Sequence, residues 1–137
     1  MAVQMNVTTR NARLDTIEST NGTSCALEIR TGAQPADCSQ ASTGTILVTI
    51  ALPTDWMAAA GSGQKAKAGT WQDASADGAG TAAHFRVYNS QVTKDGTTCF
   101  MQGSVAQGSG DLSLDNTNIA SGQQVTINTF TLTDGNS

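Results

Sequence analysis

The sequence predicts one all-β domain, an antiparallel β-sandwich or jelly roll of about seven or eight strands with a short N-terminal helix or arm. Three observations predict this class. Only 13 % of the 137 residues are charged, and Glu occurs only at Glu18 and Glu28, so strong helix formers are scarce. Short segments alternate Val, Ile or Leu with other residues, as strands do. Gly, Asn and Asp, which favour turns, separate these segments.

Residues 1–22 are expected to form an N-terminal arm and helix, and residues 23–137 the sandwich. Thr8–Ser19 is the only segment that could form a helix of more than two turns. Either threonine at its start could serve as the N-cap, and Asn21-Gly22 could end it.

A second pattern precedes this helix. Val3, Met5 and Val7 alternate with polar or small residues, as in a strand or an extended arm, and arm and helix can follow each other along the chain. An arm of this kind could add as a strand to the sheet edge of a neighbouring protein. The other interpretation is that it packs on its own sandwich.

Three segments before position 53 define the first part of the sheet. Ser24–Arg30 alternates apolar with other residues and predicts a strand with one buried face. Thr31–Thr43 is predicted to be a surface loop. Thr45–Leu52 is apolar on both faces and is bounded by Gly44 and Pro53. We therefore expect it to be an inner strand on which the others pack.

The middle of the chain predicts short elements. Thr54–Ala60 has the composition of one or two helical turns, and Lys65–Gln72 contains a short strand. Ala83–Asn89 predicts a strand that buries Phe85 and Val87. The alternate residues of that strand form its expected solvent-facing row: His84, Arg86 and Tyr88.

The last third of the chain continues the antiparallel pattern. Asp95-Gly96 is a strong hairpin signal ahead of a strand over Thr97–Val105. Asp111–Asp115 offers another short strand. In Gln123–Thr133 the apolar alternation changes phase after Ile127, which indicates a bulge or a strand buried on both faces.

The residues that could carry chemistry do not form a recognisable catalytic or metal-binding pattern. His84 is the only histidine, and the partners that a catalytic or metal site requires cannot be placed, so an ordinary surface histidine is expected. The opening of Asp73–Gly78 matches a calcium loop, but His84 stands where the bidentate Glu belongs, which favours a polar turn. The sequence therefore predicts no enzyme, no metal and no cofactor.

The three cysteines are far apart and include no C-x-x-C pair. Cys25 shares a strand face with apolar residues and is expected to be a small buried hydrophobe. A Cys25–Cys38 disulfide is conceivable, but a reducing cytosol disfavours it. The N-terminus lacks the features of a signal peptide and no apolar run reaches membrane-spanning length, so synthesis in a reducing cytosol is expected.

The charge pattern disfavours two classes of partner. The net charge is −4, and the seven basic residues are scattered rather than clustered. Nucleic-acid binding relies on clustered cations that displace counterions, so no nucleic-acid partner is expected. Binding to a membrane surface needs a basic amphipathic helix, which the sequence does not contain.

Similarity to a known family is carried by stretches spread over nearly the full chain. They are Asn11–Asp15, Ile17-Glu18, Leu27–Gly32, Leu52–Ala58, Gly69–Trp71, Ala83–Arg86, Asp115-Asn116, Ile119–Gly122 and Val125–Leu132. In these stretches the chain resembles the capsid cement (decoration) proteins of tailed double-stranded-DNA bacteriophages. The stretches are similarity features and include no mechanistic motif.

The resemblance implies a jelly-roll homodimer on the outer surface of the virion capsid. There it would bridge major capsid proteins of the HK97-type fold and stabilise the DNA-filled shell. The family has no catalytic residues to carry over. The alternative is a virion adhesin or fibre-type module that binds a host glycan through loops of the same sandwich.

Candidate residues for a capsid or dimer interface are those with apolar or amphipathic side chains near the N-terminus and after the central strand. They are Val3, Met5, Val7, Arg10, Trp56, Met57 and Trp71. Trp and Met are frequent in protein interfaces. For Trp56 the interpretation that it plugs one end of the sandwich is favoured over that of an interface anchor.

Overall fold

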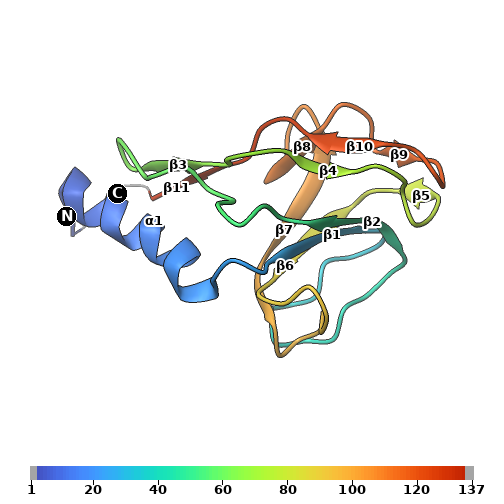
Figure 1. The fold of residues 1–137 in the computed structure, drawn as a ribbon, viewed down its shortest axis with the longest axis horizontal. Coiled ribbons are helices and arrows are strands. Elements are labelled where there is room, and N and C mark those ends of the chain that lie inside the picture. The colour runs from blue at the N-terminus through green and yellow to red at the C-terminus, as the bar shows by residue number, and fades with distance from the viewer. Residues whose placement is uncertain (1–2, 135–137) are drawn as a thin grey trace.

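The computed structural model describes residues 3–134, in which one helix is followed by short β-strands (Figure 1). The elements are α1 Val7–Asn21, β1 Ala26–Arg30, β2 Ile46–Ala51, β3 Gln64–Ala66, β4 Trp71–Asp73, β5 Gly80–Thr81, β6 His84–Tyr88, β7 Cys99–Gln107, β8 Leu112–Leu114, β9 Asn118–Ile119, β10 Val125–Ile127 and β11 Thr131–Thr133. The protein is thus mostly β with a single described helix, which confirms the predicted all-β class in its broad form.

Helix α1 begins one turn earlier than its threonines suggested. Asn6 is the N-cap: it is extended, and its side-chain oxygen accepts a hydrogen bond from Thr9 N at 2.9 Å. The prediction that Thr8 or Thr9 caps the helix was therefore wrong, because both lie inside the first turn. The predicted end is confirmed, since Gly22 N donates to the Glu18 carbonyl oxygen at 3.0 Å.

The largest sheet has five strands in the order β2-β1-β6-β7-β8. All neighbours are antiparallel except β7 and β8, which are parallel. The hairpin predicted around Asp95-Gly96 joins β6 to β7, and Cys99 N donates to the Asp95 carbonyl oxygen at 3.0 Å. Strand β2 is at the edge of this sheet, so the prediction of an inner strand over Thr45–Leu52 was wrong. Strands β1 and β6 take the inner positions.

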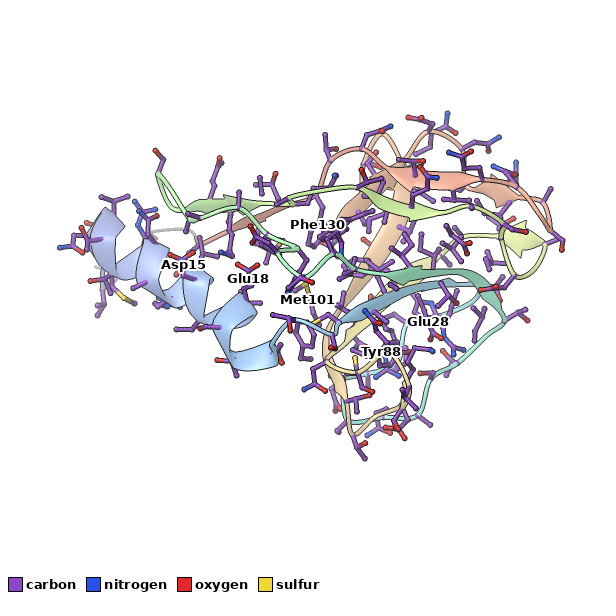
Figure 2. All side chains as sticks on the ribbon, in the orientation of Figure 1. Asp15, Glu18, Glu28, Tyr88, Met101 and Phe130 are labelled. Carbon is purple, nitrogen blue, oxygen red and sulfur yellow. The ribbon has the colours of Figure 1, made fainter. Side chains whose placement is uncertain are left out.

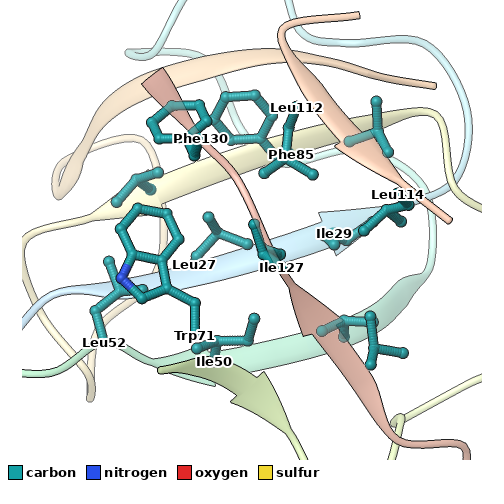
Figure 3. Packing of buried hydrophobic residues seen from close by; sticks show 14 of the residues in the cluster. Leu27, Ile29, Ile50, Leu52, Trp71, Phe85, Leu112, Leu114, Ile127 and Phe130 are labelled. Atoms are coloured by element: carbon teal, nitrogen blue, oxygen red, sulfur yellow. The ribbon is translucent and has the colours of Figure 1, made fainter. Parts of the chain in front are cut away.

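Three two-stranded ladders, β4 with β10, β3 with β11 and β5 with β9, complete the β structure. The main core lies between the five-stranded sheet and the ladder segments, where Leu27 and Ile29 of β1 face Ile127 of β10 (Figure 3). Burying one such aliphatic side chain contributes roughly 1.5–3 kcal/mol. The two-stranded ladders are too short to be stable alone. Their packing in this core therefore holds them on the five-stranded sheet.

A chain of aromatic rings runs through this core. Trp71 packs on Phe130 with ring centroids 5.5 Å apart, and Phe130 meets Phe85 edge-on at 5.6 Å. Trp56 contacts Trp71 at 6.4 Å and extends the chain towards α1. The rings connect β4, β6 and the segment before β11, which are far apart in sequence.

Two predicted elements in the second half of the chain are each divided. The predicted strand over Lys65–Gln72 is the pair β3 and β4, which belong to different ladders. The phase change after Ile127 marks neither a bulge nor a doubly buried strand. It separates β10 from β11, and these pair with different partners.

The predicted helical turns at Thr54–Ala60 are absent from the structure, which has only an isolated bridge there between Met57 and Lys67. The backbone N–H groups of this segment bond to other parts of the chain. Ala58 N donates to the Ala66 carbonyl oxygen at 2.8 Å, and Met57 N donates to Glu18 Oε2 at 3.1 Å. These long-range partners replace the hydrogen bonds that a helix would need.

Candidate functional site

An exposed apolar cluster lies at the N-terminal end of the described chain. It consists of Val3, Met5 and Val7, whose exposed fractions are 85 %, 38 % and 42 %. The other large apolar side chain that is exposed in residues 3–134 is Val92, in the loop between β6 and β7. The sequence singled out Val3, Met5 and Val7 as contact residues, and the structure places them together on the surface. We call them the N-terminal apolar cluster.

The N-terminal apolar cluster spans the junction between extended chain and helix. Residues 3–6 precede α1, and Val7 is its first residue. Arg13 Nη1 donates to Met5 Sδ at 3.3 Å, so the helix also contacts the extended part. Arm and helix therefore occur in succession, and the extended part ends at Asn6.

Arg10 is committed to contacts within the chain. Its Nη1 donates to the Asp134 carbonyl oxygen at 3.1 Å, and Arg13 Nε lies 3.2 Å from Asp134 Oδ2. Beside them, Gly63 N donates to Asn11 Oδ1 at 2.9 Å. Arg10, which is half-buried, thus joins α1 to the end of β11.

The middle of α1 is bound to the β structure by an ion cluster of Asp15, Glu18 and Lys65. Lys65 Nζ lies 2.7 Å from Asp15 Oδ1 and 3.3 Å from Glu18 Oε1, although its side chain is only 2 % exposed. It also donates to the Ala58 carbonyl oxygen at 2.9 Å. The hydrogen bond from Lys65 holds the pKa of Asp15 below its ordinary value. Figure 2 shows Asp15 and Glu18 on the side of α1 that faces the strands.

A groove of about 640 Å³ lies between α1 and the segment Thr54–Ala59. Asp15, Glu18 and Asp55 line it together with Lys65. Lys65 lies beside the carboxylates of Asp15 and Glu18 in this groove, so these acidic groups already have a cation as partner. The sequence did not predict it, because its walls come from segments that are about 40 residues apart.

The tryptophans and Met57 are internal. Trp56 and Trp71 are fully buried and Met57 is 1 % exposed, all within the apolar core. The Trp56 indole N–H donates to the Gly22 carbonyl oxygen at 3.1 Å and so fastens the end of α1. Trp56 is therefore a plug, as favoured from the sequence, and none of the three side chains is an accessible interface anchor in this structure.

The sheet face opposite the apolar core carries a polar layer. It is formed by alternate residues of β1, β6 and β7, namely Glu28, Arg30, His84, Arg86, Tyr88 and Gln102. All are buried except Gln102, which is half-buried. Two predictions were therefore wrong: β1 is buried on both faces, and the row of His84, Arg86 and Tyr88 does not face solvent.

Glu28 is the centre of the polar layer. Its Oε1 accepts hydrogen bonds from Tyr88 OH at 2.8 Å and from Arg30 Nε at 3.0 Å. The second guanidinium nitrogen of Arg30 also lies 3.0 Å from it. The buried carboxylate is thus paired, as burial of a charge requires. Figure 2 shows Glu28 and Tyr88 on this side of the sheet.

The loop formed by residues 31–45 covers the polar layer and supplies carbonyl acceptors to it. Arg86 Nη2 donates to the Cys38 carbonyl oxygen at 2.7 Å, and Gln102 Nε2 donates to that of Pro35 at 2.7 Å. His84 Nδ1 donates to the Gly32 carbonyl oxygen at 2.9 Å. Burial lowers the pKa of His84, and the nearby Arg30 and Arg86 charges add to this effect. His84 is therefore a structural donor and not a surface histidine.

The remaining sequence candidates for chemistry are engaged in local contacts. Asp73 Oδ2 accepts from Thr49 N at 3.0 Å and Asp77 Oδ2 accepts from Thr49 Oγ1 at 2.6 Å, so the loop fastens β2. Within residues 3–134 no three His, Cys, Asp or Glu side chains gather as a metal site would require. Cys25 is a free thiol in the core, as expected, and burial raises its pKa to about 11.

Residues 3–134 contain no helix that is long and apolar enough to cross a membrane. Comparisons with protein families, with curated proteins and with solved structures found no match to this chain. A functional interpretation therefore depends on the geometry of the surface together with the resemblance noted from the sequence.

Proposed function

We propose that this chain is a structural protein of a tailed-phage virion that binds the outside of the head and cements neighbouring major capsid subunits. The resemblance to capsid cement proteins supports this proposal, and the jelly-roll topology and homodimer implied by that family belong to it. The observation that carries the proposal is the exposed N-terminal apolar cluster, which lies just before and at the first residue of a helix that several polar contacts hold against the β structure.

The physical basis is multivalent attachment. Burying one exposed valine contributes at most roughly 1.5–3 kcal/mol, which is too little for a stable complex with one subunit. On a repeating shell, a dimer with two such clusters binds its second site at a high effective concentration, so occupancy rises without strong individual contacts. Because α1 is fixed to the β structure, little orientational freedom is lost when the cluster docks.

The first experiment locates the chain in the intact particle. Cryo-electron microscopy of the virion should show it on the outer surface of the head, bridging major capsid subunits. Quantitative mass spectrometry should give a copy number comparable to that of the major capsid protein. A few copies confined to the tail would reject the cement function and would favour the glycan-binding adhesin.

The second experiment tests the N-terminal apolar cluster itself. The double variant Val3→Ser, Val7→Ser should lower binding to heads that lack the protein by about ten-fold or more. It keeps Asn6, whereas deletion of residues 1–7 would remove the cap of α1. Val92→Ser is the control, because Val92 is as exposed as Val3 but lies in the loop between β6 and β7. Equal binding of both variants, with unchanged circular dichroism, would reject the cluster as the contact.

A further inference from the structure

Two of the three cysteines are brought together by the loop of residues 31–45. Cys38 lies in this loop, and its carbonyl oxygen accepts a hydrogen bond from Arg86 on β6 at 2.7 Å. Cys99 is the first residue of β7 and pairs with Tyr88 of β6. Tyr88 OH in turn lies 2.9 Å from Ser42 Oγ of the same loop. The contacts of β6 thus bring the middle of the loop to the start of β7.

The backbones also approach each other next to the two cysteines. A Cβ atom on Gly96 would lie 2.4 Å from the Ser39 carbonyl oxygen and 3.0 Å from that of Gln40. Only glycine allows the turn before β7 to come this close to the loop. Ser39 directly follows Cys38, and Gly96 is three residues before Cys99, so this contact brings together the two chain segments that carry the cysteines.

The two thiols are partly accessible. Both are free and half-buried, and Cys99 is near enough to Cys38 to raise the pKa of its thiol, while the Cys99 thiol itself donates to the Met101 carbonyl oxygen at 3.5 Å. Burial, reinforced by Cys99, raises the pKa of Cys38 to about 11. The only cysteine pair suggested by the sequence was Cys25 with Cys38. In the structure Cys25 lies in the apolar core, on the other side of the sheet from Cys38.

We propose that Cys38 and Cys99 form an intrachain disulfide when the folded chain meets a disulfide oxidant, and that this bond fastens the loop of residues 31–45 to β7. This inference does not depend on the proposed function. It assigns the cysteine pair as a site of covalent modification, with small disulfides such as oxidised glutathione as the reactant.

The reaction is two successive thiol–disulfide exchanges. The thiolate of one cysteine attacks a sulfur of oxidised glutathione, forms a mixed disulfide and releases one glutathione thiolate. The second cysteine, as its thiolate, attacks the protein sulfur of the mixed disulfide and releases the other glutathione. Two protein thiols are oxidised and one glutathione disulfide is reduced to two thiols, which take up the two protons. Because the thiolate is the reactive form, the raised pKa of Cys38 makes exchange slow at neutral pH and faster as pH rises.

The bond would act mainly on the unfolded chain. It closes a loop of roughly 60 residues, and the chain-entropy relation then predicts an unfolding equilibrium constant lower by roughly a thousand-fold. Native strain would reduce this gain.

The experiment uses the full chain, folded, with oxidised glutathione at pH 8, followed by alkylation of remaining thiols and peptide mass spectrometry. We expect one alkylated cysteine, Cys25, and one linked peptide pair containing Cys38 and Cys99, in a chain that is not cross-linked to another copy. Cys25→Ser should form the same link, whereas Cys38→Ser and Cys99→Ser should not. Three alkylated thiols after prolonged oxidation, a link to Cys25 or an interchain link would each overturn the proposal.

A second measurement tests the fastening. The oxidised chain should unfold at a higher urea concentration than the reduced chain, and the amides of residues 31–45 should exchange with deuterium more slowly. Faster exchange in this loop after oxidation would show that the bond distorts it and would contradict the proposed role.

Discussion

Replacement of Lys65 by Met tests whether the ion cluster holds α1 in place. Met keeps the approximate length of the side chain and removes the ammonium group that lies 2.7 Å from Asp15 Oδ1 and 2.9 Å from the Ala58 carbonyl oxygen. A hydrogen bond to a charged group contributes about 1.5–3 kcal/mol. Removing a buried lysine also relieves its desolvation cost, which offsets part of the loss. We therefore expect the free energy of unfolding to fall by about 1–3 kcal/mol.

The loss should stay below the value for a fully buried ion pair, because the two orphaned carboxylates reach solvent. The side chains of Asp15 and Glu18 are 46 % and 23 % exposed, so water can replace the missing ammonium. Breaking a pair whose remaining partner stays buried costs about 3–5 kcal/mol. A loss in that upper range would mean that α1 and the segment Thr54–Ala59 close over the carboxylates.

Urea unfolding and hydrogen exchange measure the effect. The amides of α1 should exchange faster in Lys65→Met, while those of the inner strands β1 and β6 keep their protection. Lys67→Met is the matched control: it lies two residues further on, and its Nζ donates to the Gly69 carbonyl oxygen at 2.8 Å without a carboxylate partner. If both variants lose the same stability, or if α1 keeps its protection in Lys65→Met, the ion cluster does not anchor the helix.

The pH dependence provides an independent check on the same variant. Lys65 lowers the pKa of Asp15 in the folded chain, so the unfolded chain binds a proton first as the pH falls. The stabilisation is complete above the unfolded pKa of about 3.9 and is lost as the pH falls through the lower folded value. Lys65→Met should therefore have a shallower loss of stability below about pH 4. If the free energy of unfolding fell equally steeply below about pH 4 in Lys65→Met and in the unchanged protein, this reasoning would be refuted.

Five further substitutions test the covering loop and the polar layer. Gly44→Ala places a Cβ 1.9 Å from the Thr31 carbonyl oxygen at a φ of 73°, so we expect a loss of about 3 kcal/mol or more in urea unfolding. Gly32→Ala has a similar φ and open space, and should lose only about 1–2 kcal/mol; equal losses would contradict the clash. Burial lowers the pKa of His84, so its contribution is complete above about pH 6.5 and decreases as the pH falls towards the lower folded value. His84→Asn retains a donor for the Gly32 carbonyl oxygen and should flatten this part of the stability profile; an unchanged slope there would show that His84 does not titrate as described. Glu28→Gln leaves the Arg30 guanidinium buried without a charged partner and should cost about 3–5 kcal/mol, whereas Tyr88→Phe should cost about 1–2 kcal/mol. Similar losses for these two variants would mean that the Glu28–Arg30 ion pair contributes no more to stability than the hydrogen bonds of Tyr88.

Local patterns predicted the elements whose partners are near in sequence. The end of the helix at Gly22 and the hairpin at Asp95-Gly96 depend on turns that a few residues specify, and the helix itself was predicted, although its N-cap is Asn6 and not Thr8 or Thr9. For Val3, Met5 and Val7 the sequence left two interpretations open, an arm that docks on a neighbour and an arm that packs on its own sandwich; in the structure these side chains are exposed. The other apolar candidates, Trp56, Met57 and Trp71, are buried, so the sequence identified the candidate surface only in part.

The place of a strand within the sheet depends on contacts between residues far apart in sequence, and the sequence pattern did not predict it correctly for β2. Strand β2 is apolar on both faces, which predicted an inner strand. In the structure β2 is an edge strand, and the segment after β4 covers its free edge: Asp77 N donates to the Leu47 carbonyl oxygen at 2.8 Å, and Thr49 N donates to Asp73 Oδ2 at 3.0 Å. Residues about 25 positions away thus cover an edge strand, and periodicity within one strand cannot reveal such a cover.

The polar layer is a second case in which alternation within one strand misplaced residues: it predicted exposure for side chains that the structure buries. Alternation assigns His84 and Arg86 to solvent because polar residues are usually exposed. They are buried because the loop of residues 31–45 brings carbonyl oxygens to them. In that loop Pro35 alone is buried, so apolar burial contributes little to holding it. Its position depends instead on hydrogen bonds that the sheet side chains donate to its backbone.

Because the loop of residues 31–45 is held mainly through its main-chain oxygens, we expect it to tolerate changes of its exposed side chains. Arg86 Nη2 and Gln102 Nε2 donate to the main-chain oxygens of Cys38 and Pro35, which remain when a loop side chain is changed. Exposed loop residues such as Gln40 should therefore tolerate Ala with a change below about 0.5 kcal/mol. The donors are different, because Arg86→Met leaves two acceptors of the loop, Ser42 Oγ and the Cys38 carbonyl oxygen, without their partner. Faster hydrogen exchange in residues 31–45 of Arg86→Met, with β1 unchanged, is the expected result. A loop that loses protection equally in Gln40→Ala would show that its own side chains, and not the polar layer, hold it on the sheet.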